Sequence, residues 1–390
     1  MRLFVTLTIA ICTLFSVATG FRLATSRGFL ATSSRLSVGR LLMASTTTDE
    51  AVVTAYKQIR EMAVGSLQAK AQAGEAPAAF VTVLSQFMEE YADSNLQANE
   101  PPERFKENTF TFLKSVQQAL AAPHKFEPFH KAIREPFDYY SWGNAFLKPL
   151  IIQDQSILRG EQNAKKIAEI IARGENVVLL SNHQTEADPQ VISILLEKYG
   201  MGDLAEKVVF VAGHKVTNDP VAIPFSMGRN LLCIHSKKHI KAVPEDVPMK
   251  QAQNLASMKA MGDLAATGGN VFWVAPSGGR DRPDETGNFV VAPFDMKAID
   301  MFKLVGMQSA KRMHFFPMAM YTHQLVPPPK EVSSTLGETR SAKRGAVSID
   351  FLDETDGLGG LKDKEFTAEI QQRVDAAYAK LVEWHSSHQK

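Results

Sequence analysis

A histidine and an aspartate five residues apart, His183 and Asp188, are the residues of this chain whose types and spacing best suit chemistry. A neutral imidazole can take a proton from an alcohol near neutral pH, and a carboxylate on its other ring nitrogen would fix its tautomer and orientation. The alternative interpretation is structural: Asp188 caps a helix and His183 forms a hydrogen bond within a loop. Because short motifs often match by chance, the surrounding sequence must decide.

The elements around this pair place it at the end of a strand. The apolar run 177–180 predicts a buried strand. Asp188-Pro189 predicts the start of a helix, with Asp188 as the N-cap and Pro189 at the first helical position. His183 would therefore lie in a strand-to-helix loop, which is where open α/β sheets bind ligands.

The order of the expected elements indicates an α/β fold that follows a helical region. Residues 49–148 carry apolar residues at helical spacing, and from about residue 150 helices alternate with strand-like runs. The pattern predicts helices over 157–171, 249–267, 295–309 and 364–385, and strands over 208–212, 230–235, 271–275, 314–320 and 346–351. We therefore predict a helical bundle domain, 45–148, and a larger α/β catalytic domain, 149–390, with a mixed, largely parallel sheet flanked by helices.

The first 44 residues have the composition of a targeting presequence. Residues 1–20 combine Arg2, an apolar run and a small-x-small triplet, as in a secretory signal. Residues 21–44 are rich in Arg, Ser and Thr and contain no acidic residue, as in an organelle transit peptide. The two in series resemble the bipartite plastid presequence of algae with secondary plastids, which predicts the plastid stroma. A plain secretory signal followed by a linker is the alternative.

Composition narrows the functional class. The hydrophobic content of 45% and charged content of 22% are typical of a soluble globular protein. Without the five arginines that precede Asp49, the formal net charge falls from +1 to −4, which argues against a nucleic-acid partner. Cys12 would leave with the signal, so Cys233 has no partner for an intramolecular disulfide. No segment after the presequence could span a membrane, and peripheral membrane contact stays open. The histidines form no recognisable ligand set, so neither a metal nor a cofactor is implied.

Basic residues and glycines follow further predicted strands. The loops after 208–212, 230–235 and 271–275 would share an edge of a parallel sheet with His183, and the first of them carries Gly213-His214-Lys215. Guanidinium forks and an ammonium group suit a phosphate, and glycine allows close backbone approach. Each loop alone would be ordinary surface charge, but together beside a candidate base they predict a phosphate pocket. Its phosphate-binding residues would be Lys238, His239, Arg280 and Arg282, supported by Ser277, Gly278 and Gly279.

Several longer motifs make the chain resemble a known family. The stretches 181–189 and 276–283 closely resemble the soluble plastid glycerol-3-phosphate acyltransferases, a branch of the phospholipid acyltransferases defined by His-x4-Asp. Further matches lie at 224–230, 236–239, 316–317 and 327–329. The resemblance covers 49–390. The wider superfamily has Glu and Gly-Thr-Arg where this chain has Ser-Gly-Gly-Arg, which points to the plastid branch. The family has an acid before a base where this chain has His214-Lys215, so only the positive charge is kept.

The resemblance implies transfer of an acyl group from acyl-acyl carrier protein, or acyl-CoA, to the sn-1 hydroxyl of glycerol 3-phosphate. The product would be lysophosphatidate, in the first step of plastid glycerolipid synthesis. It implies His183 as the base, Asp188 as its orienting partner, and a phosphate site made by Lys238, His239, Arg280 and Arg282. The sequence does not identify the oxyanion donors, for which backbone N–H groups near the helix start at 183–189 are candidates. The alternatives are a lysophosphatidate acyltransferase, a non-catalytic phosphate- or lipid-binding relative, and an esterase.

Overall fold

The computed structural model describes residues 38–235, 240, 243–329, 338–355 and 363–388, with side chains from residue 50 onward. Residues 50–390 form one compact unit. The predicted signal 1–20 and most of the predicted transit segment 21–44 lie outside the described residues, and helix α1 begins at Val38. Within the described ranges, no helix combines the length and apolar character needed to cross a membrane.

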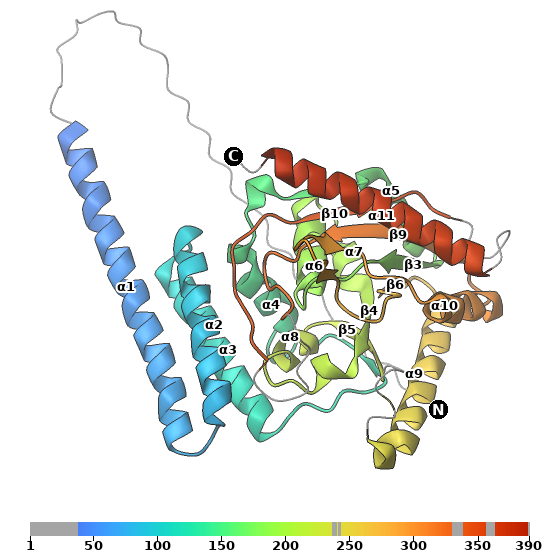
Figure 1. The fold of residues 1–390 in the computed structure, drawn as a ribbon, viewed down its shortest axis with the longest axis horizontal. Helices are drawn as coiled ribbons and strands as arrows, with labels where there is room; N and C mark the ends of the chain where they lie inside the picture. The colour runs from blue at the N-terminus through green and yellow to red at the C-terminus, as the bar shows by residue number, and fades with distance from the viewer. Residues whose placement is uncertain (1–37, 236–239, 241–242, 330–337, 356–362, 389–390) are drawn as a thin grey trace, which may run out of the picture. The chain divides into compact units, whose positions relative to one another are not determined.

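A mixed sheet of eight strands occupies the centre of the described part of this unit, in the order β1-β5-β4-β6-β3-β9-β10-β2 (Figure 1). The central strands β5, β4, β6, β3 and β9 are parallel, whereas β10 runs antiparallel to β9 and β1 antiparallel to β5. Edge strand β2 is parallel to β10. The predicted mixed, largely parallel sheet is confirmed. The strand bounds are β1 Phe129–His130, β2 Ile157–Arg159, β3 Asn176–Ser181, β4 Val208–Gly213, β5 Asn230–Ile234, β6 Val271–Val274, β9 Met313–Tyr321 and β10 Ser348–Phe351.

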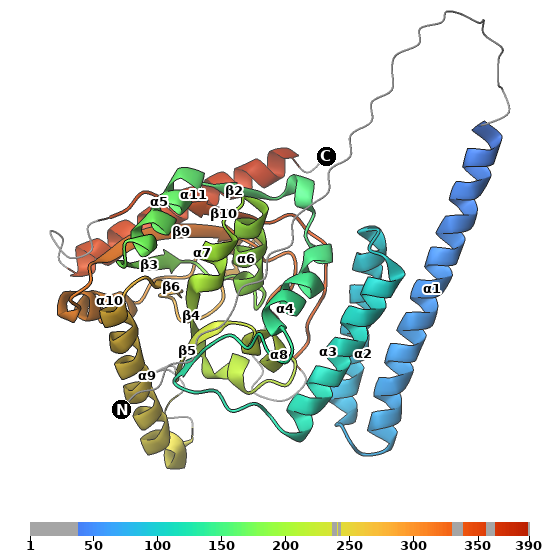
Figure 2. The same cartoon turned by 180° about the vertical axis from the view of Figure 1, so that it is seen from behind.

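Helices cover both faces of the sheet (Figures 1 and 2). Strand β3 is buried along its whole length, and its side chains alternate between two apolar clusters. Val177 and Leu179 belong to the cluster that contains α2 to α7, while Val178 and Leu180 belong to the cluster that contains α9, α10 and α11. This is the period-two alternation of a pleated strand that is covered on both faces, and it explains the continuous apolar run. The helix bounds are α1 Val38–Gln72, α2 Ala78–Gln97, α3 Pro102–Ala121, α4 Tyr139–Leu147, α5 Glu161–Ala172, α6 Asp188–Lys198, α7 Gly202–Lys207, α8 Ile223–Met227, α9 Val247–Thr267, α10 Met296–Gln308 and α11 Asp363–His388.

Aromatic side chains join the N-terminal helices to the rest of the unit. The rings of Tyr56 and Phe105 stack at 4.5 Å between centroids, and those of Tyr91 and Phe146 stack at 4.1 Å. The Tyr91 hydroxyl also donates to the Phe146 carbonyl oxygen at 3.0 Å. All four residues belong to the same apolar cluster as Val177 of β3. The predicted division into domains at residue 148 stays a prediction.

The sequence pattern predicts a helix over 157–171, and the structure corrects its first part. Ile157 and Leu158 lie in strand β2, and the helix begins only at Glu161. Gly160 separates the two elements with a φ of +67°, and a Cβ at this position would lie 1.9 Å from the Phe351 carbonyl oxygen. Only glycine fits such a left-handed residue against a neighbouring backbone. A short apolar run beside a helical pattern cannot be separated from it by periodicity alone.

Candidate active site

The carboxyl ends of the parallel strands bring the loops after β3 and β6 together. The Asp281 N–H donates to the His183 carbonyl oxygen at 2.6 Å, which joins the two loops directly. The predicted meeting of these loops at one sheet edge is therefore confirmed. Lys238 and His239, in the predicted loop after β5, lie outside the described residues.

His183 and Asp188 form a hydrogen-bonded pair. The His183 Nδ1 lies 2.7 Å from the Asp188 Oδ2. Because a carboxylate oxygen accepts, Nδ1 is the nitrogen that donates to Asp188, which leaves Nε2 as the basic nitrogen of the neutral ring. Asp188 is fully buried, whereas the His183 side chain remains 24% exposed. The imidazole also meets the ring of Trp273 edge to face at 5.5 Å. The pair thus presents an oriented imidazole with an accessible edge.

The Asp188 carboxylate turns back into its own loop rather than capping the helix. Helix α6 begins at Asp188 itself, so Ala187 is the N-cap and the expected cap position is wrong by one residue. The Asp188 Oδ2 accepts from the backbone N–H of Gln184 at 2.8 Å and of Thr185 at 3.3 Å. The Ala187 N–H donates to the Thr185 hydroxyl oxygen at 3.2 Å. These three N–H groups, which are among the candidate oxyanion donors, are already engaged.

Two buried amides connect the loop after β3 to strand β9 and to Asp281. Asn182 donates from Nδ2 to the Asp281 Oδ2 at 2.9 Å, and its Oδ1 accepts from the Met320 N–H at 2.8 Å. Gln184 accepts at Oε1 from the Thr322 N–H at 2.9 Å and donates from Nε2 to Asp281 at 3.3 Å. Sequence reasoning missed these supporting residues. The sequence feature that could have indicated them is the group of uncharged polar residues that directly follows the apolar run 177–180.

Asp281 is the buried centre of this hydrogen-bond group. Its carboxylate accepts from the Ala292 N–H at 2.9 Å as well as from the two amides. Burial raises the pKa of Asp281 to about 6, although the donors around it favour the charged form. Although it lies between two arginines in the sequence, Asp281 is fully buried and holds two loops together.

A cluster of ion pairs surrounds Arg280. Its guanidinium donates to the Glu186 carboxylate at 3.2 Å and to the Glu338 carboxylate at 3.1 Å. Arg340 binds the same Glu186 at 2.8 Å and Asp219 at 2.8 Å. The last member is Lys215, which pairs with Glu338. The charge that the sequence keeps at Lys215 therefore has a carboxylate partner from a distant segment. We call these six residues the ion cluster.

The basic side chains of the ion cluster favour the ionised form of Glu186. Burial by itself raises the pKa of Glu186, but the nearby guanidinium groups of Arg340 and Arg280 outweigh it and lower that pKa to about 2. The Glu186 side chain is 16% exposed and the Arg280 side chain 10%. Both guanidinium nitrogens of Arg280 that point at carboxylates are thus occupied before any substrate arrives.

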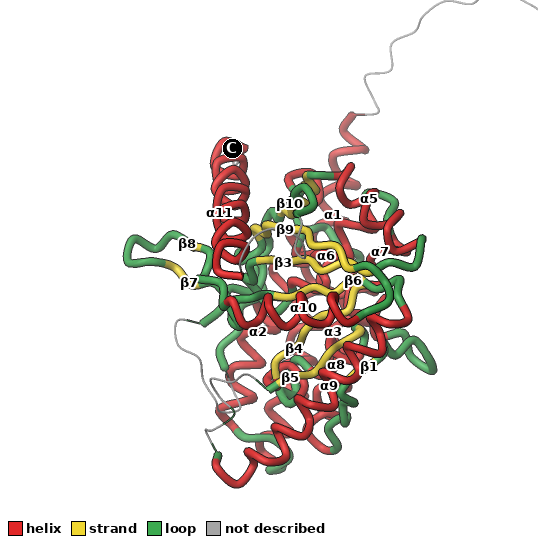
Figure 3. The backbone as a smooth tube through the Cα atoms, turned by 90° about the vertical axis from the view of Figure 1, so that its right-hand side faces the viewer, coloured by secondary structure: helices red, strands yellow, loops and turns green. Residues whose placement is uncertain are grey.

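Arg282 differs from Arg280 in its partners. It begins the hairpin of β7 (Arg282–Pro283) and β8 (Phe289–Val290), which extends outward on the same side as α11 in Figure 3. Its Nη1 donates to the carbonyl oxygens of Arg280 at 3.2 Å and Asp281 at 3.1 Å. Within the described ranges, no carboxylate pairs with this guanidinium. Arg282 is therefore the predicted phosphate ligand that keeps its charge available.

The loop between β6 and Arg280 has an open backbone. Gly278 has a φ of +67°, and no atom lies within 4 Å of a Cβ built at Gly278 or at Gly279. The Ser277 hydroxyl donates to the Gly279 carbonyl oxygen at 2.9 Å and closes the turn. The geometry leaves room for another molecule to approach this stretch of main chain.

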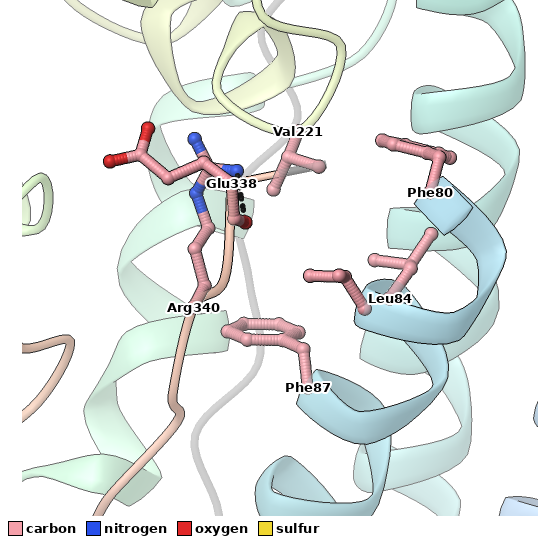
Figure 4. A pocket seen from close by; sticks show the side chains of 7 residues that line it. Phe80, Leu84, Phe87, Val221, Glu338 and Arg340 are labelled. Carbon is pink, nitrogen blue, oxygen red and sulfur yellow. Dashed lines mark hydrogen bonds between the residues drawn. The ribbon is translucent and has the colours of Figure 1, made fainter. Parts of the chain in front are cut away.

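A small hollow lies between helix α2 and the ion-cluster residues Glu338 and Arg340. Figure 4 shows the α2 side chains Phe80, Leu84 and Phe87 facing Val221 and Arg340. The hollow has a volume of about 10 Å³, which is room for about one water molecule. It therefore does not hold a substrate. Among the described residues, no group of three or more His, Cys, Asp or Glu side chains is arranged to hold a metal ion.

Comparison with known proteins places this site in a family. A family model described as "Acyltransferase" matches residues 158–322. A chloroplastic glycerol-3-phosphate acyltransferase of Cucurbita moschata is 39% identical over 325 residues, which cover 83% of this chain and 69% of that protein. The chain belongs to the glycerol-3-phosphate acyltransferase family. A second family member, from Arabidopsis thaliana, is 38% identical over 322 residues, which cover 82% of this chain and 70% of that protein.

The family assignment and the site fall on the same part of the chain. The matched residues 158–322 include the pair His183 and Asp188 as well as Arg280 and Arg282. A solved 1-acyl-sn-glycerophosphate acyltransferase from Thermotoga maritima is similar with a TM-score of 0.39 and 14% identity, over 78% of this chain and 93% of that chain. The structure brings His183, Asp188, Arg280, Arg282 and the loop 277–279 together at one edge of the sheet.

Proposed function

We propose that this protein transfers an acyl group from a thioester donor to the sn-1 hydroxyl of glycerol 3-phosphate and forms lysophosphatidate. The observation that carries the proposal is the hydrogen bond of 2.7 Å between His183 Nδ1 and the buried Asp188 carboxylate. It occurs in a chain whose relatives are named glycerol-3-phosphate acyltransferases. A pure binding protein has no need of such an oriented base.

The chemistry requires one base and no covalent acyl-enzyme. His183 Nε2 takes the proton of the acceptor hydroxyl while its oxygen attacks the thioester carbonyl carbon. The new C–O bond forms a tetrahedral intermediate, which collapses as the C–S bond breaks. The leaving thiolate then takes the proton from the His183 imidazolium. Asp188 holds the Nδ1–H and stabilises the imidazolium, so the ring keeps the correct tautomer throughout.

We assign the acceptor phosphate to the basic residues beyond the pair. Arg282 keeps its charge free of any described carboxylate, and Lys238 and His239 would add to it. Arg280 already binds Glu186 and Glu338, so a phosphate would have to share it. The open main chain at Gly278 and Gly279 allows the phosphate or glycerol to approach closely.

The donor and the location belong to the same proposal. Acyl carrier protein, or coenzyme A, would present the acyl thioester in the plastid stroma, after removal of the bipartite presequence 1–44. Relatives that are named chloroplastic support the plastid. Measuring turnover of the same acyl group on carrier protein and on coenzyme A would decide the donor.

The decisive experiment uses the purified chain from residue 45 onward with labelled acyl-acyl carrier protein. Glycerol 3-phosphate, lysophosphatidate or no acceptor is added, and products are separated. Label in lysophosphatidate that depends on glycerol 3-phosphate supports the proposal. Label in phosphatidate only, with lysophosphatidate as acceptor, would make the protein a lysophosphatidate acyltransferase. Free fatty acid without any acceptor would make it an esterase, and no turnover at all would leave a binding protein.

A further inference from the structure

We propose that Thr322 is a positioning residue of this active site, which aims His183 by fixing the Asp188 carboxylate. The inference rests on the proposed function, because it assumes that His183 acts as the base. Thr322 follows strand β9 directly, whereas the pair lies after β3. The two strands are parallel neighbours, with Ser181 opposite Met318.

The two oxygens of the Asp188 carboxylate have different partners. The Oδ2 accepts from His183 Nδ1, Gln184 N and Thr185 N, all of which belong to the same loop. The Oδ1 accepts from the Thr322 hydroxyl at 2.6 Å, and no other donor to this oxygen occurs in the part of the chain that the structure describes. Among the described residues, the hydrogen bond from Thr322 is therefore the only one that ties the Asp188 carboxylate to the end of a neighbouring strand.

The direction of this hydrogen bond follows from the chemistry of the groups. An ionised carboxylate only accepts, so the threonine hydroxyl must donate. Hydrogen bonds of O–H to a charged oxygen are short, typically about 2.5–2.7 Å, and the observed 2.6 Å fits. Asp188 and Thr322 are both fully buried, so bulk water does not reach the site to replace the hydroxyl.

Fixing the second oxygen matters because the terminal torsion of an aspartate is broad and roughly two-fold. A donor on Oδ1 from a sheet strand holds the carboxylate plane and keeps Oδ2 in line with His183 Nδ1. Without it, the carboxylate can turn, and the imidazole loses its fixed orientation toward the acceptor hydroxyl. The loss should affect the chemical step and not the binding of glycerol 3-phosphate.

The main chain at this position is anchored independently of the hydroxyl. The Thr322 N–H donates to the Gln184 Oε1 at 2.9 Å, and a substitution of the side chain leaves this bond in place. Thr322→Val keeps the shape and removes the donor, while Thr322→Ser keeps the donor and removes a methyl group. The two variants form a matched pair that separates the hydroxyl from the packing.

The test measures kcat and KM for glycerol 3-phosphate, with thermal melting as the check on folding. We expect Thr322→Val to lower kcat roughly 10- to 100-fold with KM within about twofold, and Thr322→Ser to restore most of kcat. In an Asp188→Asn background, Thr322→Val should add little, because residues that act through one another are not additive. Equal losses in both backgrounds, or a wild-type kcat in Thr322→Val, would overturn the inference.

Two further outcomes keep the test decisive. If Thr322→Val does not fold, Thr322→Ser carries the test: a kcat more than about tenfold below wild type, at an unchanged melting temperature, contradicts a role of the hydroxyl. If the wild-type protein shows no turnover that depends on glycerol 3-phosphate, the proposed function itself fails. An active wild type with an unaffected Thr322→Val refutes only the role of Thr322.

Discussion

The His183–Asp188 pair and the ion cluster meet at one edge of the sheet but are built in different ways. The pair comes from one loop and the first residue of the helix that follows it, and its members are five residues apart. The ion cluster brings together Glu186 with Arg280 and Arg340, which are 94 and 154 residues away in sequence. One arrangement is local and the other depends on the complete fold.

Because of this difference, we expect the pair to serve catalysis and the ion cluster to serve stability. His183 is partly exposed and has one acidic partner, so its removal leaves Asp188 with donors from Gln184, Thr185 and Thr322. In the ion cluster each charged side chain has a partner of opposite charge. Removing one of them leaves its partner's charge buried without compensation, which destabilises the fold. Because Glu186 lies in the same loop as His183, the cluster holds that loop from outside the reaction centre.

The largest expected effect is that of His183→Ala on catalysis. Loss of the general base should lower kcat by roughly 10²–10⁴, while the free energy of unfolding changes by less than about 1 kcal/mol because the other donors to Asp188 remain. Steady-state kinetics and urea unfolding of the same preparation check both parts. A His183→Ala protein with wild-type kcat, or one that unfolds at a much lower urea concentration than wild type, would show that the pair does not serve catalysis alone.

Arg340→Met should do the reverse and cost stability. The variant leaves Asp219 and one side of Glu186 without their cation in a buried site, and breaking such a pair costs about 3–5 kcal/mol. Arg173→Met is the matched control, because Arg173 pairs with Glu175 at 55% side-chain exposure and exposed pairs contribute about 0–1 kcal/mol. Urea unfolding of both variants gives the difference. Equal small losses would show that the cluster is not a stabilising unit.

The same variant changes the acid dependence of stability. In the wild type the pKa of Glu186 is lowered from 4.5 to about 2, with Arg340 as the main opposing charge to burial. A carboxyl with a lowered pKa stabilises the fold above its unfolded value and loses that contribution as pH falls from about 4.5 to about 2. In Arg340→Met the pKa of Glu186 should rise, so unfolding free energy should depend less steeply on pH in this window.

The same contrast explains what the sequence could predict. The apolar runs of β3, β6 and β9 follow from local pattern because both faces of these strands are buried, and the meeting of the loops at one edge follows from the parallel order of strands. The pair at 183 and 188 lies within a single strand-to-helix connection, with Asp188 as the first helical residue, and needed no tertiary information. The errors are local too: Ile157 lies in a strand because the left-handed Gly160 delays the start of the helix to Glu161, and the N-cap expected at Asp188 lies one residue earlier, at Ala187.

The ion cluster and Thr322 could not be predicted from the sequence. Thr322 meets Asp188 across 134 residues, and Glu338 meets Arg280 across 58. No local pattern distinguishes these residues from ordinary surface positions. Only the order of strands in the sheet determines which of them become neighbours. The sequence predicted Arg280 as a phosphate ligand, which stays a prediction, and the structure shows that its guanidinium also has two carboxylate partners.

Arg282→Ala should sharpen the distinction between the two arginines. Loss of one charged hydrogen bond to the acceptor phosphate costs about 1.5–3 kcal/mol, which should raise KM for glycerol 3-phosphate roughly 10- to 100-fold, because Arg282 has no carboxylate partner among the described residues. Its melting temperature should stay close to wild type. Arg280→Ala, as the comparison, should lower the melting temperature as well. Unchanged acceptor dependence in Arg282→Ala would remove it from the phosphate site.

The smallest expected effects come from the glycine pair, which separates backbone strain from substrate access. Gly278 has a φ of +67° in open space, so Gly278→Ala should cost about 1–2 kcal/mol of stability from the left-handed backbone alone. Gly279 is equally open but has no positive φ, so Gly279→Ala should leave stability unchanged and raise KM only if substrate approaches that main chain. Urea unfolding and acceptor kinetics on both variants give four values. A destabilised Gly279→Ala with unchanged KM would mean that this turn serves the fold and not the substrate.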